Sequence, residues 1–332
     1  MASHWRTRDF RNSLGSRRRL VWYEKDVKSS LPPDKTHGFR LQASDEIGYS
    51  CAPELEDMYK LSPFVWREND RFQMLLRVVN RDEDASRKVA RIHYGQSSDG
   101  VHFELETVPV IAPDPAADAY DNGGCEDPTL AIAGSTRYVY YSGWNQHLKR
   151  GELLLAAGDD VHRLVKRGIA LPSTEATHNP KEAEIVSVAD GSWRLFFEYA
   201  ANDQSKIGIA RSSSVDGPWE ILPPLFAARP QMWDAFHLST GPVISSDPDF
   251  PVMFYNGATR EAQWRVGWVV FDATYSRVVA RSTDPIVLPD IKRNHDDTDI
   301  AFAASAVEID NAIHLYYSVA DQYVMRAQIH RV

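Results

Sequence analysis

The chain has 332 residues, of which 43% are hydrophobic and 25% charged, an ordinary composition for a globular protein. Its net charge of −9 disfavours nucleic acid as the main partner, because nucleic-acid binding favours a basic surface. With two cysteines, no secretory signal and no apolar run near the ~18 residues of a membrane helix, the sequence predicts a cytoplasmic protein without a disulfide framework or a membrane partner.

The first residues carry the main basic cluster. Six arginines lie within residues 1–20, and no apolar segment follows them. Charge runs at a terminus are usually solvated, so we interpret residues 1–20 as a basic arm. We interpret residues 21–332 as one catalytic domain, since an all-β fold can hold this many residues as a single unit.

A repeated strand pattern runs through the rest of the chain. A strand that ends in bulky residues recurs as FQMLLRV, RYVYYSG, WRLFFEY, PVMFYNG and IHLYYSV, at intervals of 65, 56, 58 and 62 residues. A shorter apolar strand and a polar turn precede each copy, which is typical of hairpins. Repeats of a roughly four-stranded antiparallel unit predict an all-β fold, a five-bladed β-propeller, rather than a β-sandwich with accidental similarity.

Polar side chains gather where the innermost strand of each predicted blade begins. In a propeller these starts converge on one end of the channel, so residues far apart in sequence can act together. Blade one begins with Ser62-Pro63, whereas the other four starts bring carboxylates. The candidate site residues at these starts are Glu126, Asp127, Glu182, Glu184, Trp233, Asp234, His237 and Asp299. Each alone resembles a turn or cap residue, but their convergence predicts a site.

The predicted site has the chemistry of a glycosidase. Crowded carboxylates split their pKa values, so that one donates a proton and another stays ionised, and glycosidic-bond cleavage needs such a pair. Trp144 and Trp233, with Trp264, offer flat faces for sugar rings. The expected partner is an oligosaccharide or glycoside, and an oligomer is compatible with the fold. Nucleotide-binding, nucleophile-elbow and zinc-protease motifs are absent from the sequence, so we expect no metal and no cofactor.

These segments resemble glycoside hydrolase family 130, the β-mannoside phosphorylases and related hydrolases. GGCEDPTLAI is similar to the family's E-D-P-R motif, and WRVGWVVFDATYSRVVARSTDPIVLPD to its blade-four signature. DIAFAASAVEIDNAIHLYYSVAD is similar to its last blade, so the match runs from about residue 60 to the end. The resemblance implies that Asp127 is the proton donor and that Arg77, Arg91, Arg265 and Asp321 lie near the sugar sites.

Departures from the family pattern indicate whether water or phosphate accepts the cleaved sugar. Thr129 replaces the arginine of E-D-P-R, and Asn256 replaces the histidine of Y-H-G. Glu198 stands where the family often has an arginine, and the blade-three segment KEAEIVSVAD lacks a second lysine. A phosphorylase binds a dianion and needs cationic donors in fixed positions. We therefore expect a hydrolase, with a phosphorylase as the alternative.

An inverting hydrolase needs a second carboxylate as base, about 6.5–9.5 Å from the acid. Blade three offers Glu182 and Glu184 on one face of a strand. The same segment resembles, more distantly, glycoside hydrolase family 43, whose acid would be Glu182, although Ser62 stands where that family has its aspartate base. Asp234 is the alternative partner. A family-43-like furanosidase and a non-catalytic sugar-binding propeller remain open alternatives.

Overall fold

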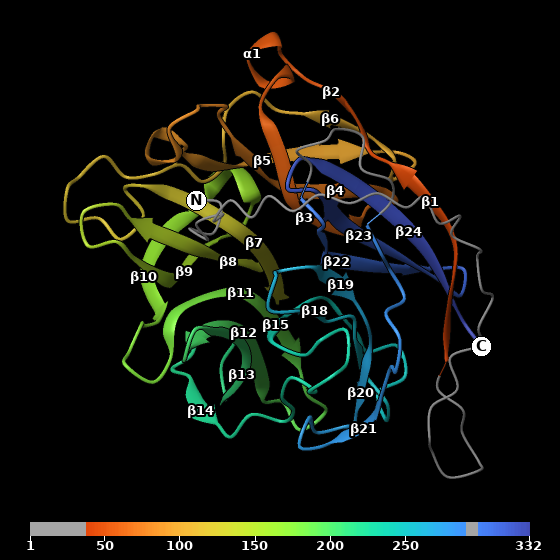
Figure 1. Ribbon diagram of the computed structural model, residues 1–332. Helices are drawn as coiled ribbons and strands as arrows, with labels where there is room; N and C mark the ends of the chain where they lie inside the picture. Colours follow the sequence, from red (N-terminus) through yellow and green to blue (C-terminus); the bar gives the residue numbers. More distant parts are fainter. Residues whose placement is uncertain (1–37, 290–297) are drawn as a thin grey trace, which may run out of the picture.

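The described residues form a ring of blades. The computed structural model describes residues 38–289 and 298–332, and Figure 1 shows their sheets arranged around a common centre. The predicted arm at residues 1–20 lies outside the described residues. The fold is a five-bladed β-propeller, as the repeat predicts.

Blade one is a five-stranded sheet, and blades two and three have four strands each. Blade one contains β2 (Gly48–Ser50), β3 (Tyr59–Glu68), β4 (Arg71–Val79), β5 (Ala90–Ser97) and β6 (His102–Leu105). Blade two contains β7 (Gly124–Ala133), β8 (Thr136–Asn145), β9 (Arg150–Gly158) and β10 (Val165–Leu171). Blade three contains β11 (His178–Ser187), β12 (Trp193–Ala201), β13 (Gln204–Ser212) and β14 (Glu220–Leu222). Short helices α1 (Pro53–Glu56), η1 (Ala85–Arg87) and η2 (Val161–Arg163) lie in the connections.

Blade four is divided into two small sheets, in the orders β15-β18-β19 and β16-β17-β20-β21. Its strands are β15 (His237–Ser239), β16 (Val243–Ile244), β17 (Val252–Met253), β18 (Asn256–Ala258), β19 (Trp264–Val266), β20 (Val269–Phe271) and β21 (Val278–Arg281). The inner strand is interrupted at Gly241-Pro242, where proline has no N–H to donate to the ladder. Gly241 is required there, because a Cβ would lie 1.9 Å from the Phe254 carbonyl oxygen.

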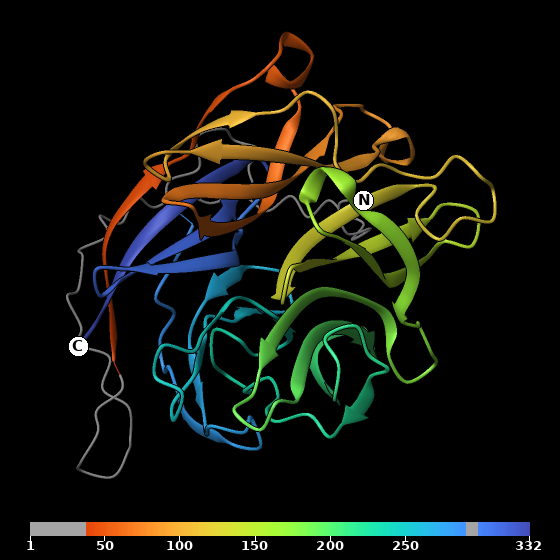
Figure 2. The same cartoon turned by 180° about the vertical axis from the view of Figure 1, so that it is seen from behind.

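Blade five closes the ring by combining the two ends of the described chain. Its strands are β22 (Ala301–Ile309), β23 (Ala312–Val319), β24 (Tyr323–Arg331) and β1 (Phe39–Glu46). Figures 1 and 2 show β1 along the outside of this blade, where it pairs antiparallel with β24. This pairing ties the N-terminal part of the propeller to its last blade.

The repeated bulky residues form the core between the blades. The five positions that define the repeat are each at most 1% exposed: Leu76, Tyr141, Phe197, Tyr255 and Tyr317. Burying large apolar side chains at one fixed position of every blade stabilises the packing of neighbouring sheets. The sequence repeat is therefore the packing repeat of the propeller.

Candidate active site

The inner strands of blades one, two and three carry a bulge at the same level. The pairing register shifts at Leu61/Phe64, Glu126/Thr129 and Lys181/Glu184. Ser62, Asp127 and Glu182 occupy these bulges with φ angles of 48°, 47° and 50°. A left-handed backbone is uncommon outside glycine, and a bulge redirects the side chain that it carries. Three neighbouring blades thus direct one side chain each into the same space.

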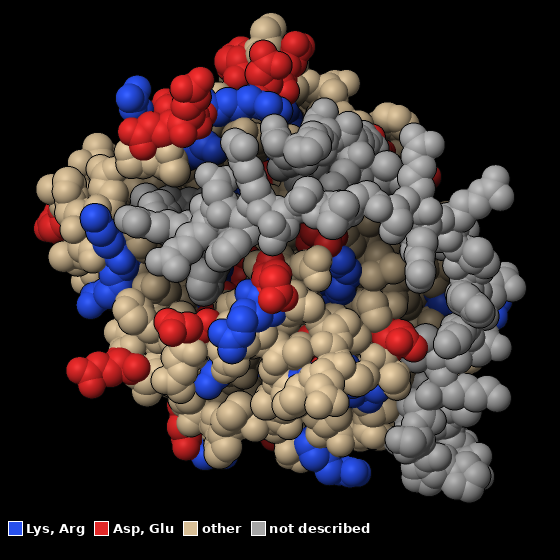
Figure 3. Space-filling view, in the orientation of Figure 1, with Lys and Arg blue, Asp and Glu red and all other residues tan. Residues whose placement is uncertain are grey.

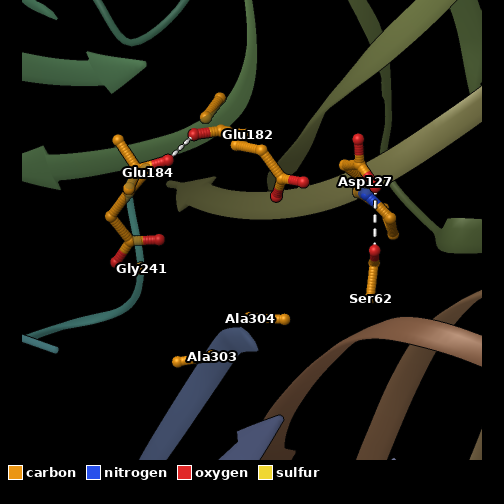
Figure 4. A pocket seen from close by; sticks show the side chains of 10 residues that line it. Ser62, Asp127, Glu182, Glu184, Gly241, Ala303 and Ala304 are labelled. Carbon is orange, nitrogen blue, oxygen red and sulfur yellow. Dashed lines mark hydrogen bonds between the residues drawn. The ribbon is translucent and has the colours of Figure 1, made fainter. Parts of the chain in front are cut away.

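That space is a small cavity lined by all five blades. Its lining consists of Ser62, Asp127, Pro128, Glu182, Ala183, Glu184, Thr240, Gly241, Ala303 and Ala304. Figure 4 shows Asp127 and Glu182 across the cavity from each other, on neighbouring strands. The structure therefore brings together the acid of the E-D-P motif and the two glutamates predicted from blade three.

Asp127 is held as a carboxylate by its neighbours. Its Oδ1 accepts hydrogen bonds from Ser62 Oγ at 2.8 Å and from Arg77 Nη1 at 2.9 Å. Arg77 also forms an ion pair with Glu126, at 2.9 Å, so one buried guanidinium serves both acids of the motif. Burial alone would raise the pKa of Asp127, but Arg77, Lys181 and Ser62 together lower it.

The pKa of Glu182 is shifted in the opposite direction. Desolvation inside the channel, followed by the negative charge of Asp127, raises the pKa of the Glu182 carboxyl well above its ordinary value. Its backbone carbonyl accepts a hydrogen bond from the Thr240 hydroxyl, which ties the bulge to blade four. Two carboxyls in one cavity, with pKa values shifted in opposite directions, are the arrangement that acid catalysis of glycoside cleavage needs.

Glu184 lies two residues after Glu182 on β11, and its carboxyl contacts residues of blades two and four. Its Oε1 accepts a hydrogen bond from Val243 N at 2.9 Å, and its Oε2 lies 3.5 Å from Thr129 Oγ1. Desolvation raises its pKa to about 8, despite these hydrogen bonds, so the carboxyl is neutral at pH 7. Thr129, which departs from the family pattern, is thus in contact with Glu184.

Further charged groups lie around Asp127 and Glu182. Lys181 Nζ lies 3.4 Å from Glu198 Oε1, and its side chain is 37% exposed. Although desolvation lowers the pKa of Lys181, the charges of Glu198, Glu182 and Asp127 together raise it. Asp321 is near enough to Arg77 and Lys181 for both to lower its pKa, but desolvation raises it overall. Sequence reasoning gave no role to Lys181, which the blade-three motif could have indicated.

An aromatic row, made of Phe236, His237, Trp264 and Phe302, lies beside the cavity. The ring centroids are 4.6 Å apart for Phe236 and His237, and 5.7 Å apart for the stacked rings of His237 and Trp264. Trp264 meets Phe302 edge-on at 5.2 Å, and Phe302 directly precedes Ala303 of the cavity lining. Such a row suits the apolar faces of sugar rings. The sequence did not single out Phe236 or Phe302.

Three other predicted residues, Arg91, Arg265 and Asp299, do not line the cavity. Arg265 forms an ion pair with Asp299 at 2.9 Å, beside Trp264. Arg91, on β5, is half-buried and donates to the Val89 carbonyl at 3.4 Å. These contacts orient the two arginines and leave their predicted sugar contacts as a hypothesis.

Trp144 and Trp233 are the other two of the three tryptophans predicted as sugar platforms. Trp144 is half-buried near the end of β8, and its indole N–H has no hydrogen-bond partner among the described residues. Trp233 stacks on Tyr255 at 5.4 Å and donates its N–H to the Thr283 carbonyl at 3.0 Å. Trp233 therefore packs inside blade four and does not line the cavity.

Asp234 is not brought to the cavity. It is fully buried and accepts hydrogen bonds from Arg229, Arg281 and the Tyr255 hydroxyl, the last at 2.6 Å. Two arginines and a phenol occupy its oxygens, so it is part of a structural ion-pair cluster within blade four. Asp234 does not line the cavity that holds Asp127, and its predicted role as the base partner of Asp127 stays a hypothesis.

Figure 3 shows acidic and basic side chains interspersed over the described part of one face. Over residues 38–289 and 298–332, no group of three or more His, Cys, Asp or Glu side chains is placed to hold a metal ion. No helix in the same ranges is long and apolar enough to span a membrane.

Comparison with known proteins places the chain in a family. Residues 62–331 match the family model described as β-1,4-mannooligosaccharide phosphorylase, so the chain belongs to glycoside hydrolase family 130. A β-1,2-mannobiose phosphorylase of Thermoanaerobacter sp. (strain X514) is 23% identical over 277 residues, which cover 80% of this chain and 87% of that protein.

Solved structures share the fold. The β-1,2-mannobiose phosphorylase of Listeria innocua, in complex with β-1,2-mannobiose, superposes with a TM-score of 0.70 at 20% identity, covering 92% of this chain and 95% of that one. A second structure has a TM-score of 0.74 at 22% identity, covering 91% and 96%. It was described with the finding that the mannoside phosphorylases of this family contain hydrolases that target β-1,2-mannosidic linkages in Candida mannan.

These comparisons confirm the predicted family and fold. They also support an enzyme that processes mannosides. The descriptions of the family and of the Thermoanaerobacter relative favour phosphorolysis, whereas the sequence analysis preferred hydrolysis.

Proposed function

We propose that this chain cleaves a β-mannosidic bond with inversion, using inorganic phosphate as acceptor. The family model and the phosphorylases of Thermoanaerobacter and Listeria support this acceptor. The observation that carries the proposed cleavage is the pair Asp127 and Glu182, which face one cavity from equivalent bulges and whose pKa values are shifted in opposite directions.

Glu182 is the proton donor in this mechanism. It passes its proton to the glycosidic oxygen while the bond between that oxygen and C1 breaks. The ionised Asp127 stabilises the positive charge that develops at C1. A phosphate oxygen forms the new bond to C1 from the opposite face, so the products are a mannose 1-phosphate and a shortened sugar. The family resemblance implies the reverse assignment, with Asp127 as donor, and the surroundings of the two side chains favour Glu182.

Lys181 is the cation that we assign to the phosphate. Its distance of 3.4 Å to Glu198 exceeds the about 2.7–2.9 Å of a strong charge-assisted hydrogen bond. Its side chain is partly exposed, so Lys181 can bind an incoming phosphate oxygen without first breaking a short hydrogen bond. Arg77 is less available, because Glu126 and Asp127 already hold it.

Hydrolysis is the second candidate, and the pairing of the cations favours it. Arg77 and Lys181 both have carboxylate partners, and Glu198 adds a negative group where the family often has an arginine. A dianion entering the channel therefore meets cations that are already paired. In this version, Asp127 removes a proton from the attacking water, and Glu182 again protonates the leaving oxygen.

One experiment separates the two acceptors. The full chain is incubated with β-1,2-mannobiose and β-1,4-mannobiose, with and without phosphate. Mannose 1-phosphate formed only with phosphate supports the first candidate, and free mannose released without phosphate supports the second. A folded protein that cleaves neither disaccharide under either condition contradicts the proposed function.

Two variants test the roles within the reaction. Glu182→Gln should lower kcat by about 10²–10⁴-fold, since it removes the proton donor. Lys181→Met should raise the KM for phosphate by about tenfold if the ammonium binds phosphate. An active Glu182→Gln variant contradicts the assignment of the donor.

A further inference from the structure

We propose that Ser62 is a positioning residue for Asp127, which it holds through one carboxylate oxygen so that the other faces the reacting sugar. This inference rests on the proposed function of the Asp127–Glu182 pair. No family motif quoted above includes Ser62, and the sequence analysis treated it only as the place where a base is missing.

The contacts of Asp127 are unequal between its two oxygens. Oδ1 accepts from both Ser62 Oγ, at 2.8 Å, and Arg77 Nη1, at 2.9 Å. Within the part of the chain that the structure describes, no group donates to Oδ2. Because two donors on one oxygen fix the rotation of the carboxylate, Oδ2 is the oxygen left to act on the substrate.

Ser62 is itself fixed by the backbone. It is 9% exposed, occupies the bulge of β3 and donates its N–H to Ser318 Oγ of blade five at 3.0 Å. The bulge of Ser62 is equivalent to those of Asp127 and Glu182, so all three side chains project into one cavity. A carboxylate at this position would repel Asp127, whereas a hydroxyl can donate to it.

The hydroxyl acts on charge as well as on orientation. A hydrogen bond donated to the ionised form of a carboxyl favours that form, and the Ser62 hydrogen bond is among the interactions that lower the pKa of Asp127. Lys181 and Arg77 also face Asp127 and lower its pKa, while burial raises it. Loss of the hydroxyl should therefore raise the pKa of Asp127 and loosen its carboxylate, with the two cations still in place.

The test compares Ser62→Ala with a matched control, Ser305→Ala. Ser305 is also buried and is bonded to β3, accepting from Val65 N at 2.9 Å and donating to the Pro63 carbonyl at 2.6 Å. Among the described residues it forms no hydrogen bond with Asp127. The pKa of Asp127 is measured by carbon-13 NMR titration of its carboxyl, assigned with Asp127→Asn. The pH profile of kcat is measured in parallel on β-mannobiose.

We expect Ser62→Ala to raise the pKa of Asp127, to move the acidic limb of kcat to higher pH and to lower kcat about tenfold, with KM little changed. Ser305→Ala should lower stability but leave the pKa of Asp127 and the acidic limb where they are. Ser62→Cys keeps a weaker donor, so its pKa of Asp127 and its kcat should lie between those of the wild type and of Ser62→Ala. The cysteine variant therefore provides the test if the alanine variant does not fold.

Two results overturn the inference. Either the pKa of Asp127 is the same in the wild type and Ser62→Ala, or both alanine variants shift it equally, which would make the effect a general one of β3. A different result would show that the proposed function is wrong. In that case the wild type cleaves no β-mannoside, while the titration still reports whether Ser62 holds Asp127.

Discussion

Replacing Arg77 by methionine tests how the site keeps two acids in one buried place. Arg77 is 6% exposed and pairs with Glu126 and Asp127 at 2.9 Å each. Over the described ranges, no second cation lies within ion-pair distance of Asp127. Removing one partner of a buried ion pair costs about 3–5 kcal/mol, because the remaining charge is left unpaired. We expect a loss of stability of this size at pH 7.

The loss converts to a measurable shift in Tm. An unfolding entropy of about 2.1 cal/mol/K per residue gives roughly 0.7 kcal/mol/K for a chain of 332 residues. A cost of about 3–5 kcal/mol then lowers Tm by about 4–7 °C. The pKa of Asp127 is lowered by folding, so its stabilising contribution is present above the unfolded pKa and disappears as the pH falls through the folded pKa. The difference between the variant and the wild type should therefore narrow in acid.

The assay is thermal unfolding followed by circular dichroism, at pH 7 and at several acidic pH values. Arg194→Met is the matched control. Arg194 is 9% exposed and bonds Ser192 and the Trp193 carbonyl, and within residues 38–289 and 298–332 no carboxylate lies within ion-pair distance of it. If Arg77→Met and Arg194→Met lower Tm equally, or if the Arg77→Met difference is as large in acid as at pH 7, the reasoning is refuted.

Three further variants test other parts of the site. Folding raises the pKa of Glu184 from 4.5 to about 8, so the unfolded chain loses this proton first and the free energy of unfolding falls as the pH rises between these values. Glu184→Gln should flatten this fall when the free energy of unfolding is measured by urea titration at several pH values. An unchanged dependence on pH would contradict the prediction. Asp234→Asn should lower stability by about 3–5 kcal/mol and leave kcat of the folded enzyme unchanged, whereas a large loss of kcat would restore Asp234 as a catalytic group. Trp264→Ala should raise the KM for mannosides about three- to tenfold in steady-state kinetics, and an unchanged KM would remove the aromatic row from the binding site.

The architecture could be predicted because packing and sequence repeat together. Tyr141, Phe197 and Tyr317 fall at the same place in their blades and are buried there, so their spacing reports the blade period. The closing strand β1 was not predicted, since its partner β24 lies at the other end of the chain. A pairing between distant segments leaves no local pattern in either of them.

The cavity could be predicted only in part, because bulges decide which side chains enter it. Asp127 and Glu182 reach the cavity through left-handed residues within strands, a feature that the simple alternation of a strand does not contain. Asp234 also belongs to a predicted blade start, but Arg229 and Arg281 hold it inside blade four. The second of these arginines is 47 positions away in sequence, so no local pattern reveals the pair.

The choice between water and phosphate as acceptor shows why the charge of the channel cannot be read from residue counts. The sequence has Thr129 and Glu198 where the family has arginines, and blade three contributes Glu182 and Glu184, which by simple count makes the channel strongly negative. Desolvation raises the pKa values of Glu182 and Glu184, however, so both are held toward their neutral forms. The field that a phosphate meets is therefore less negative than the count indicates. Lost arginines and gained glutamates are thus not sufficient evidence for hydrolysis, which is why the acceptor has to be decided by the products formed with and without phosphate.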